Sequence, residues 1–588
     1  MSGGLYRSAN AMPEGFQPPA DGIPVISVRP LNGTPPGSPP PNPAVAPEPT
    51  PEPEETGSAA RNSLVMAVGS LVSRITGFLR TVAVTAALGA GAVGDAYTTA
   101  QIFPGLVYEF LIGGILTSVV VPVLVRRRKA DPDRGEAYAQ RLLTLAVLTL
   151  GLATLVALLT APLLTWVYAS DNPPEYRSLV TTLSYLLLPM IFFMGLSALL
   201  AALLNTRGHF AAPMWTPIIN NLVVIAVAGL YIAIFGARVI EPEQMTPARI
   251  LLIGGGTLLG VAAQAATLTP ALRKVGFRWR WRFDFRALGL RELARLGGWM
   301  FCYVAVTQIG LIVLFNLLNR ASKENAAGPL IYNNVYLMLM MAHGIVGVSI
   351  ITALMPRMSA AAADRRFADL TADLTRGTRM VTTVLAPVAV VYAVLAQPIS
   401  VVLFRYGAFT AENALATSLV LLAAAIALIP FALSRLYTSA FYAVADTKTP
   451  ALINIPVVAL RALLQIGVFV VFTAQFTAVG LMIGNAVSYV VAAVASTWQL
   501  RKHVGRIGLH DMMANFGKVL VAALGSALAG LAVVNLLPGE APLTWTESAV
   551  RLVVGGAVIG LTYVGLAFLL RLQEINAVLG MIRRRLVR

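Results

Sequence analysis

The sequence predicts an all-α, polytopic membrane protein with about 14 transmembrane helices, arranged as two six-helix lobes plus two C-terminal helices. Of the 588 residues, 57% are apolar and only 12% are charged, about half the roughly 25% of a soluble domain. The apolar residues recur in stretches of about 20, the length that crosses roughly 30 Å of hydrocarbon. A weak internal repeat gives the division into lobes. This composition excludes a cytosolic enzyme, a secreted disulfide scaffold and a coiled coil.

Residues 1–60 differ from the rest of the chain. They hold 15 of the 36 prolines, six acidic residues and little hydrophobic periodicity, a composition that cannot bury enough surface to offset its ordering entropy. They lack a basic stretch followed by an apolar one, so we do not expect a signal peptide. We expect a disordered, proline-rich cytoplasmic tail.

Fourteen apolar spans follow Arg61, and no loop between them exceeds about 25 residues, too short for a soluble catalytic domain. The protein therefore acts within the bilayer. The predicted spans are 63–88, 95–125, 142–168, 178–203, 213–236, 250–272, 296–319, 329–355, 380–404, 411–434, 450–473, 476–499, 516–537 and 549–570.

Basic residues predict the orientation of these spans. The net charge is +17, but the basic residues occupy short loops between apolar spans, so we do not expect nucleic acid as a partner. With a cytoplasmic tail, 31 Lys and Arg lie on the inner side and seven on the outer side. Because inner loops of membrane proteins are enriched in Lys and Arg, both termini are expected on the cytoplasmic side of the membrane.

Two similar turns indicate an internal repeat. Residues 205–213 lie between spans four and five, and residues 446–450 between spans ten and eleven; each carries a basic residue and reaches a proline that opens the next span. An offset of six spans places two halves in the same membrane orientation, as in transporters. We therefore expect an N-lobe over 61–273, a C-lobe over 274–500 that begins with a basic cytoplasmic loop, and spans thirteen and fourteen with a basic tail over 501–588.

Two arginines in the first span predict an anion site. Arg74 lies about 15 Å beyond Leu64, near the membrane midplane, and Arg80 lies about 24 Å beyond it. An arginine at the centre of a span costs roughly 2.5–3.5 kcal/mol, so both should face a water-filled chamber or a partner. Ser73 shares a helical face with Arg80. Guanidinium groups bind phosphate through two parallel charge-assisted hydrogen bonds.

Other polar residues leave alternatives open. One arginine could instead reach the membrane surface while the other pairs with Asp95, and Asp95 could cap its own helix or line the chamber. Glu109 could pair with an arginine. Arg461, in span eleven, could be a chamber anion site or an interlobe salt bridge.

The titratable residues predict no metal site and no cofactor. No histidines and carboxylates have the spacing of metal ligands, and there is no phosphate-binding loop. The single cysteine, Cys302, excludes an intrachain disulfide and a thiolate cluster.

Four segments carry a resemblance to a known family. The chain resembles the MurJ (MviN) family of the MOP exporter superfamily from about residue 62 to its C-terminus. The segments are 73–80 (SRITGFLR) followed by 94–97 (GDAY), 204–213 (LNTRGHFAAP), 403–410 (LFRYGAFT) and 441–450 (FYAVADTKTP).

The resemblance implies a multi-pass lipid II flippase of the bacterial plasma membrane, which is a transporter and not an enzyme. Such a protein moves undecaprenyl-pyrophosphate-linked disaccharide-pentapeptide from the inner to the outer leaflet by alternating access, with cavity arginines holding the pyrophosphate. Alternative functions are export of another undecaprenyl-linked glycan, a cation-coupled drug antiporter of the same superfamily, and a membrane scaffold for cell-wall assembly. Expected partners are the lipid-linked saccharide, membrane lipids and, through residues 1–60, cell-wall synthesis proteins.

The family's site residues map onto Ser73, Arg74, Arg80 and Asp95. Two other family arginines are replaced, by Tyr108 and by Leu337. Span seven contains no acidic residue, so a sodium site built on a carboxylate there is not expected. We expect the chamber charge to be distributed differently in this chain, with Arg461 as a contributor.

Overall fold

The computed structural model describes residues 53–112, 121–288, 290–324, 326–505, 507–539 and 542–574. The chain divides into two units, residues 1–58 and 59–588, and the helices that bear on function belong to the second. Within the described ranges every regular element is a helix. Residues 1–52, most of the predicted disordered tail, lie outside the described residues, as do 113–120 of predicted span two and 575–588 of the basic C-terminal tail.

The helices before residue 275 cover the first six predicted spans. Spans two, three, four and six each comprise more than one element. The elements are α1 (Pro53–Leu88), α2 (Ala92–Ile112), α3 (Val121–Ala130), α4 (Glu136–Leu159), α5 (Ala161–Ala169), α6 (Pro174–Leu187), α7 (Met190–Thr206), α8 (Ala211–Phe235), α9 (Pro247–Ile250), the π-helix η3 (Leu251–Gly255) and α10 (Gly256–Lys274).

The remaining eight predicted spans are likewise helical. The elements are α11 (Leu290–Ser322), α12 (Pro329–Ala363), α13 (Phe367–Val394), α14 (Ala396–Phe404), α15 (Ala411–Ala443), α16 (Lys448–Val471), α17 (Ala474–Val504), α18 (Leu509–Leu536) and α19 (Trp545–Leu569).

Thirteen described segments are long and apolar enough to cross a membrane. The difference from the fourteen predicted spans is α2, which falls outside that criterion. It carries Asp95 and Glu109 together with Gln101 and two threonines, and these polar residues lower its hydropathy. The all-α membrane fold is thus confirmed, and α2, with its polar residues, lies at the candidate site.

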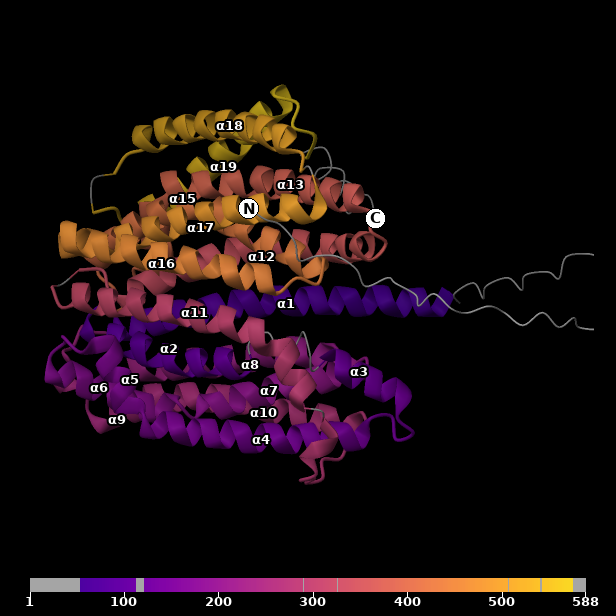
Figure 1. Ribbon diagram of the computed structural model, residues 1–588. Coiled ribbons are helices and arrows are strands. Elements are labelled where there is room, and N and C mark those ends of the chain that lie inside the picture. The colour runs from indigo at the N-terminus through magenta and orange to yellow at the C-terminus, as the bar shows by residue number, and fades with distance from the viewer. Residues whose placement is uncertain are drawn as a thin grey trace, which may run out of the picture. The chain divides into compact units, whose positions relative to one another are not determined.

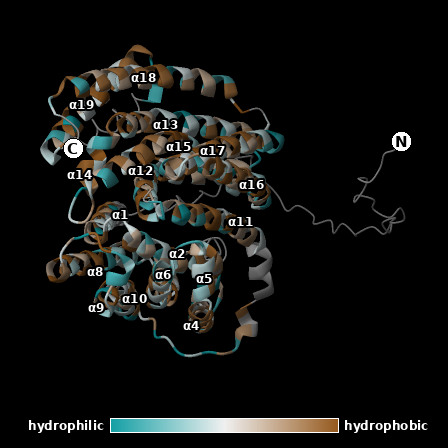
Figure 2. Ribbon diagram, turned by 90° about the vertical axis from the view of Figure 1, so that its left-hand side faces the viewer, coloured by the Kyte–Doolittle hydropathy of each residue, from teal (hydrophilic) through white to brown (hydrophobic). Residues whose placement is uncertain are grey.

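The helices form two packed groups with α1 between them. We call α2 and α4–α10 the N-terminal group, and α12–α17 the C-terminal group; within each, neighbours such as α8 and α10 or α15 and α17 pack along much of their length. Figures 1 and 2 both place α1 between α8 of the first group and α12 of the second. Helix α11 packs on α16 and α17, and also on α2 and α5. The predicted lobe borders at 273 and 500 stay predictions.

Burial differs strongly between the centre and the edge of the molecule. Helix α15 buries small residues such as Ala424 and Ala427 against α12, α13 and α17, which allows close backbone approach in a membrane bundle. Helix α18 exposes Leu520, Leu524 and Leu528, and Figure 2 shows apolar residues along its outer side. These exposed leucines belong to a surface that faces lipid.

Two asparagines make matching contacts in the two halves. The Asn221 side chain, in α8, donates to the Ser73 carbonyl at 3.2 Å and to Thr76 Oγ1 at 3.0 Å in α1. The Asn454 side chain, in α16, donates to the Tyr303 carbonyl at 3.1 Å and to Thr307 Oγ1 at 2.9 Å in α11. Spans five and one thus meet as spans eleven and seven do, in keeping with an offset of six spans.

Candidate functional site

Three cavities share lining residues, one within each helix group and one where the two groups meet, and we call them together the chamber. The first cavity has a volume of about 280 Å³ and is lined mainly by residues of α11, α12, α15, α16 and α17. It shares Ile102 and Asn333 with a cavity of about 230 Å³. That cavity shares Arg80 and Gln101 with a third, of about 390 Å³, bounded by α2, α7, α8 and α10. The chamber therefore touches both helix groups.

The charged residues that line the chamber are all basic. Arg80 lines the two cavities on the N-terminal side, and Arg435 and Arg461 line the cavity on the C-terminal side. Among the residues that the structure describes, no Asp or Glu lines the three cavities. Such a surface attracts anions and repels cations.

Arg461 projects from α16 toward α11. Its guanidinium group rests against Gly310, where any side chain would collide with it. In the part of the chain that the structure describes, its Nε and Nη2 atoms are buried and have no hydrogen-bond partner. Tyr489 lies close enough to interact with it electrostatically. A buried guanidinium with unused donors is prepared to bind an anion.

Arg435 is a chamber residue that the sequence analysis missed. Its guanidinium lies 5.3 Å from the centre of the Phe431 ring and is exposed to the chamber. Tyr303, Tyr336 and Tyr489 are within its electrostatic range, and so is Glu109 of α2 from the opposite helix group. The C-terminal wall therefore combines two guanidinium groups with phenolic hydroxyls.

Arg435 was missed because predicted span ten ended at residue 434, which placed the arginine in a loop. Helix α15 continues to Ala443. A sequence signal was present: Leu436, Tyr437, Ala440 and Phe441 repeat with helical spacing, and all four are buried. This continued period predicts that the helix does not end before Arg435.

Arg80 lies where the sequence placed it, in the chamber wall. It shares the wall with Gln101 and with Tyr108, the position where the family has an arginine. The other replaced arginine position, Leu337, lines the cavity next to it. Tyr108 and Leu337 therefore both face the chamber. Arg80 is the one positively charged residue among the described residues that line these two cavities.

Arg74 and Ser73 occupy different surroundings. The Arg74 guanidinium rests against Gly344 of α12, and neither residue is among those that line the chamber cavities. The Ser73 carbonyl accepts from Asn221, so this face of α1 packs against α8. Arg74 instead crosses from α1 to the C-terminal group, as the rotation between positions 74 and 80 requires. Their role in binding stays a prediction.

Asp95 is buried and outside the chamber. Its carboxylate accepts from the Ser322 hydroxyl of α11 and, at 2.8 Å, from the backbone N–H of Leu330 in the first turn of α12. The side chain therefore caps a helix, but that helix is α12 and not α2, to which Asp95 belongs. Capping of a helix by a residue far away in the sequence cannot be predicted from the local sequence.

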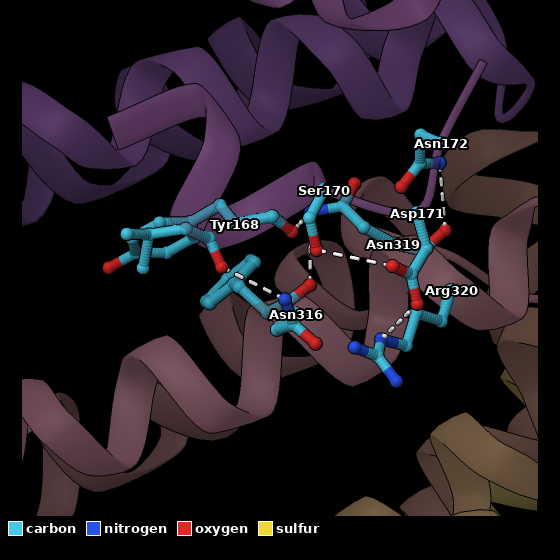
Figure 3. Close-up of polar contacts among 9 residues, drawn as sticks. Tyr168, Ser170, Asp171, Asn172, Asn316, Asn319 and Arg320 are labelled. Carbon is cyan, nitrogen blue, oxygen red and sulfur yellow. Dashed lines mark hydrogen bonds and ion pairs between the residues drawn. The ribbon is translucent and has the colours of Figure 1, made fainter. Parts of the chain in front are cut away.

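Asp95 belongs to a set of polar contacts that join the helix groups at one end. Asn319 of α11 donates to the Tyr168 carbonyl at 3.2 Å, and its own carbonyl accepts from Asn172 at 3.0 Å (Figure 3). Arg320 pairs with Asp171 at 3.1 Å. Nearby, the Asn334 side chain of α12 donates to Thr85 of α1 at 3.0 Å. We call this set the end latch.

Comparison with known proteins identifies the family. The family model for the lipid II flippase MurJ matches residues 84–541. The chain belongs to the MurJ lipid II flippase family. It is 27% identical to a probable lipid II flippase MurJ of Rhizobium tropici over 90% of this chain and 97% of that protein. It is 24% identical to one of Synechocystis sp. over 80% of this chain and 87% of that protein.

Solved structures agree on the fold. A lipid II flippase MurJ in an inward closed conformation matches with a TM-score of 0.68 and 18% identity, over 89% of this chain and all of that chain. An inward-facing multidrug resistance MATE family transporter of the MOP superfamily matches with a TM-score of 0.59 and 15% identity, over 73% and 94%. The chain is a multi-pass membrane protein of a transporter family, not of an enzyme family.

Proposed function

We propose that this protein moves lipid II from the inner to the outer leaflet of the bacterial plasma membrane by alternating access. The observation that carries the proposal is the chamber: Arg80, Arg435 and Arg461 line it, and no carboxylate among the described residues lines the same cavities. The family membership supports this substrate class, and the arginines support the way in which it binds.

The arginines address the physical obstacle to flipping. Moving an isolated ion into hydrocarbon costs tens of kcal/mol by Born solvation, so a pyrophosphate needs a polar path. Guanidinium groups replace water around phosphate oxygens with bidentate hydrogen bonds. Arg80 binds from the N-terminal side, and Arg435 and Arg461 from the C-terminal side, while the polyprenyl chain stays in lipid.

The end latch supports a direction for the transport cycle. With both termini in the cytoplasm, which the distribution of basic residues favours, the latch lies on the outer side. The chamber then opens toward the inner leaflet, where lipid II is made. Substrate loading followed by rupture of the latch would expose the chamber outward. Arg74 reaches from α1 to Gly344 of α12, so its contacts change when the lobes move from the inward-open to the outward-open state.

Two finer parts of the proposal concern organisation. The lobes comprise residues 61–273 and 274–500, and rock against each other about the chamber. Residues 1–60 form a cytoplasmic tail that contacts cell-wall synthesis proteins, since the composition of the tail suits a binding segment.

A drug-exporting function fits the chamber less well. A chamber for cationic drugs needs carboxylates, and the lining residues here supply guanidinium and hydroxyl groups. The MATE match has 15% identity and therefore speaks for the fold alone.

Depletion in a strain without another lipid II flippase tests the proposal. We expect lipid II to accumulate in the inner leaflet when expression stops, and the wild-type chain to restore outward movement. Purified protein in vesicles should move fluorescent lipid II, and should not move a matched undecaprenyl-linked glycan that lacks the pentapeptide. Normal leaflet distribution during depletion, or equal transport of both lipids, would contradict lipid II as the substrate.

A further inference from the structure

Residues 277–285 form an unusual segment after α10, and we call it the arm. Its sequence alternates aromatic and charged residues over FRWRWRFDF. Residues 277–284 form neither a helix nor a strand, and a short 3-10 helix begins at residue 285. Rings two positions apart contact each other, Trp279 with Trp281 and Trp281 with Phe283, as they would in an extended chain. In an extended chain, alternate side chains point to opposite sides. The arm thus has an aromatic side and a basic side.

The aromatic side is ordered as a row of rings. Trp279 and Trp281 have ring centres 4.5 Å apart, and Trp281 and Phe283 are stacked at 6.1 Å. Trp281 is 54% exposed and Phe283 is 65% exposed. Such large apolar groups on the outside of a protein mark a contact surface.

Hydrogen bonds hold the arm on the first turns of α4. Thr144 Oγ1 accepts from the Trp279 indole at 3.4 Å and from the Arg282 backbone N–H at 3.2 Å. The Gln140 side chain donates to the Arg278 carbonyl at 2.8 Å and accepts from Arg282 Nε at 2.7 Å. The arm is therefore a fixed part of the surface.

Helix α4 sets the depth of the arm in the membrane. Leu148, Leu152 and Leu155 follow Thr144 on the same helical face, and all are exposed, as expected for a lipid-facing strip. Leu148 is about 6 Å along the helix from Thr144. The arm therefore lies where the hydrocarbon ends and the headgroups begin, the depth at which Trp residues gather.

The charges beside the arm leave two arginines available. Arg278 and Arg280 are exposed, and within the described ranges neither forms an ion pair. Two carboxylates beside the arm already have partners. Asp284 pairs with Arg141 at 3.5 Å, and Asp133, within electrostatic range of Arg282, accepts from the backbone N–H of Ala137 at 2.8 Å. Two free guanidinium groups beside interfacial aromatic rings suit a lipid phosphate.

We propose that the arm is a binding site for anionic phospholipid headgroups. Arg278 and Arg280 donate to the phosphate, and Trp281 and Phe283 enter the boundary between headgroups and acyl chains. The depth of the arm, beside a lipid-facing strip of α4, favours a membrane lipid over a nucleic acid or a soluble protein. The site is separate from the chamber and does not depend on what the chamber transports.

Tryptophan quenching by brominated lipid tests the proposal. The full chain is placed in vesicles that contain either brominated phosphatidylglycerol or brominated phosphatidylcholine over the same series of mole fractions. A basic residue near an anionic surface contributes about 1 kcal/mol, or about fivefold per arginine. We expect phosphatidylglycerol to quench at several-fold lower mole fraction, and the W279F/W281F variant to lose this difference. Equal quenching by the two lipids in the wild-type chain would overturn the proposal.

Charge variants separate the arm from general attraction by a basic protein. The R278Q/R280Q variant should lose the preference for phosphatidylglycerol by at least about fivefold. The control R365Q/R376Q removes two other exposed arginines, one in the turn between α12 and α13 and one within α13, and should keep the preference. An equal loss in both variants, or capture of a fluorescent RNA by the arm without a lipid preference, would contradict a lipid site.

Discussion

The two walls of the chamber use the same helix contacts but carry different charge. In each half an asparagine, Asn221 or Asn454, fixes one helix to its neighbour through a carbonyl and a threonine hydroxyl. The N-terminal wall offers Arg80, whereas the C-terminal wall offers Arg435 and Arg461 among tyrosines. The helix packing is thus repeated in the two halves, whereas the charged residues that line the chamber differ between them. The lining residues determine what each wall binds.

Removing the chamber arginines should have the largest effect. A hydrogen bond to a charged group contributes about 1.5–3 kcal/mol, so we expect Arg435→Ala and Arg461→Ala each to lower lipid II flipping by about 10–100-fold. Arg80→Ala should do the same if both walls hold the pyrophosphate. Lysine should rescue only in part because it lacks the planar fork.

The effect of each arginine variant is measured as the rate of lipid II flipping in vesicles at matched protein levels. The control is Arg365→Ala, which removes an exposed arginine outside the chamber. Full activity of the Arg435→Ala variant would show that Arg435 does not bind the headgroup. It would contradict the statement that the charges of the C-terminal wall serve substrate binding.

Weakening the end latch should shift the balance between the two open states. In Asp95→Asn the side chain no longer accepts two hydrogen bonds as a carboxylate, a loss of about 1–2 kcal/mol, which raises the outward-open population by about 5–30-fold. A cysteine at Ala327, buried beside the latch, should then react faster with a membrane-impermeant reagent in a Cys302→Ser background. Unchanged reactivity would show that Asp95 only caps α12.

The glycines behind two arginines allow a finer test of the walls. In Gly310→Ala and in Gly344→Ala the new methyl group occupies space held by the guanidinium of Arg461 and of Arg74, respectively. These side chains are flexible, so the fold should persist while the guanidinium moves. We expect flipping to fall by about 3–10-fold with Gly310→Ala, equivalent to about 1 kcal/mol.

Thermal unfolding in detergent provides the control, because the melting temperature should hardly change in either variant. A similar loss with Gly344→Ala would place Arg74 in the binding site beside Arg461, and unchanged flipping in the Gly310→Ala variant would separate Arg461 from the substrate.

The paired asparagines should have small and equal effects. Each makes two hydrogen bonds, and a hydrogen bond between membrane helices averages about 0.6 kcal/mol. We therefore expect Asn221→Leu and Asn454→Leu each to cost about 1 kcal/mol of stability, measured by thermal unfolding. A large effect at only one of the two positions would show that the halves are not held in the same way.

Deleting residues 2–52 should have the smallest effect on transport. The segment contains neither an apolar span nor a chamber residue, so the flipping rate in vesicles should stay within about twofold of wild type, well below 1 kcal/mol. Loss of transport at an unchanged membrane level would assign the tail a part in the cycle.

The sequence determined which segments cross the membrane, because crossing depends on hydropathy over about 20 residues. Helix α16 runs from Lys448 to Val471 against a predicted 450–473. The same local reasoning predicted a polar environment for Arg80, since an arginine deep in a span needs one, and Arg80 lines two of the cavities. Its part in substrate binding stays a prediction. Where the helix ends were misjudged, as at Arg435, a charged residue interrupted the apolar run although the helical period continued.

Tertiary structure alone decided what each polar residue contacts. Arg74 and Arg80 lie six positions apart on one helix, yet one rests against Gly344 and the other lines the chamber, because the neighbouring helices differ on the two faces. Asp95 caps a helix more than 230 positions away in the chain. Hydropathy is a property of each segment by itself, whereas such contacts depend on which helices are neighbours, and that is set by packing over the whole bundle.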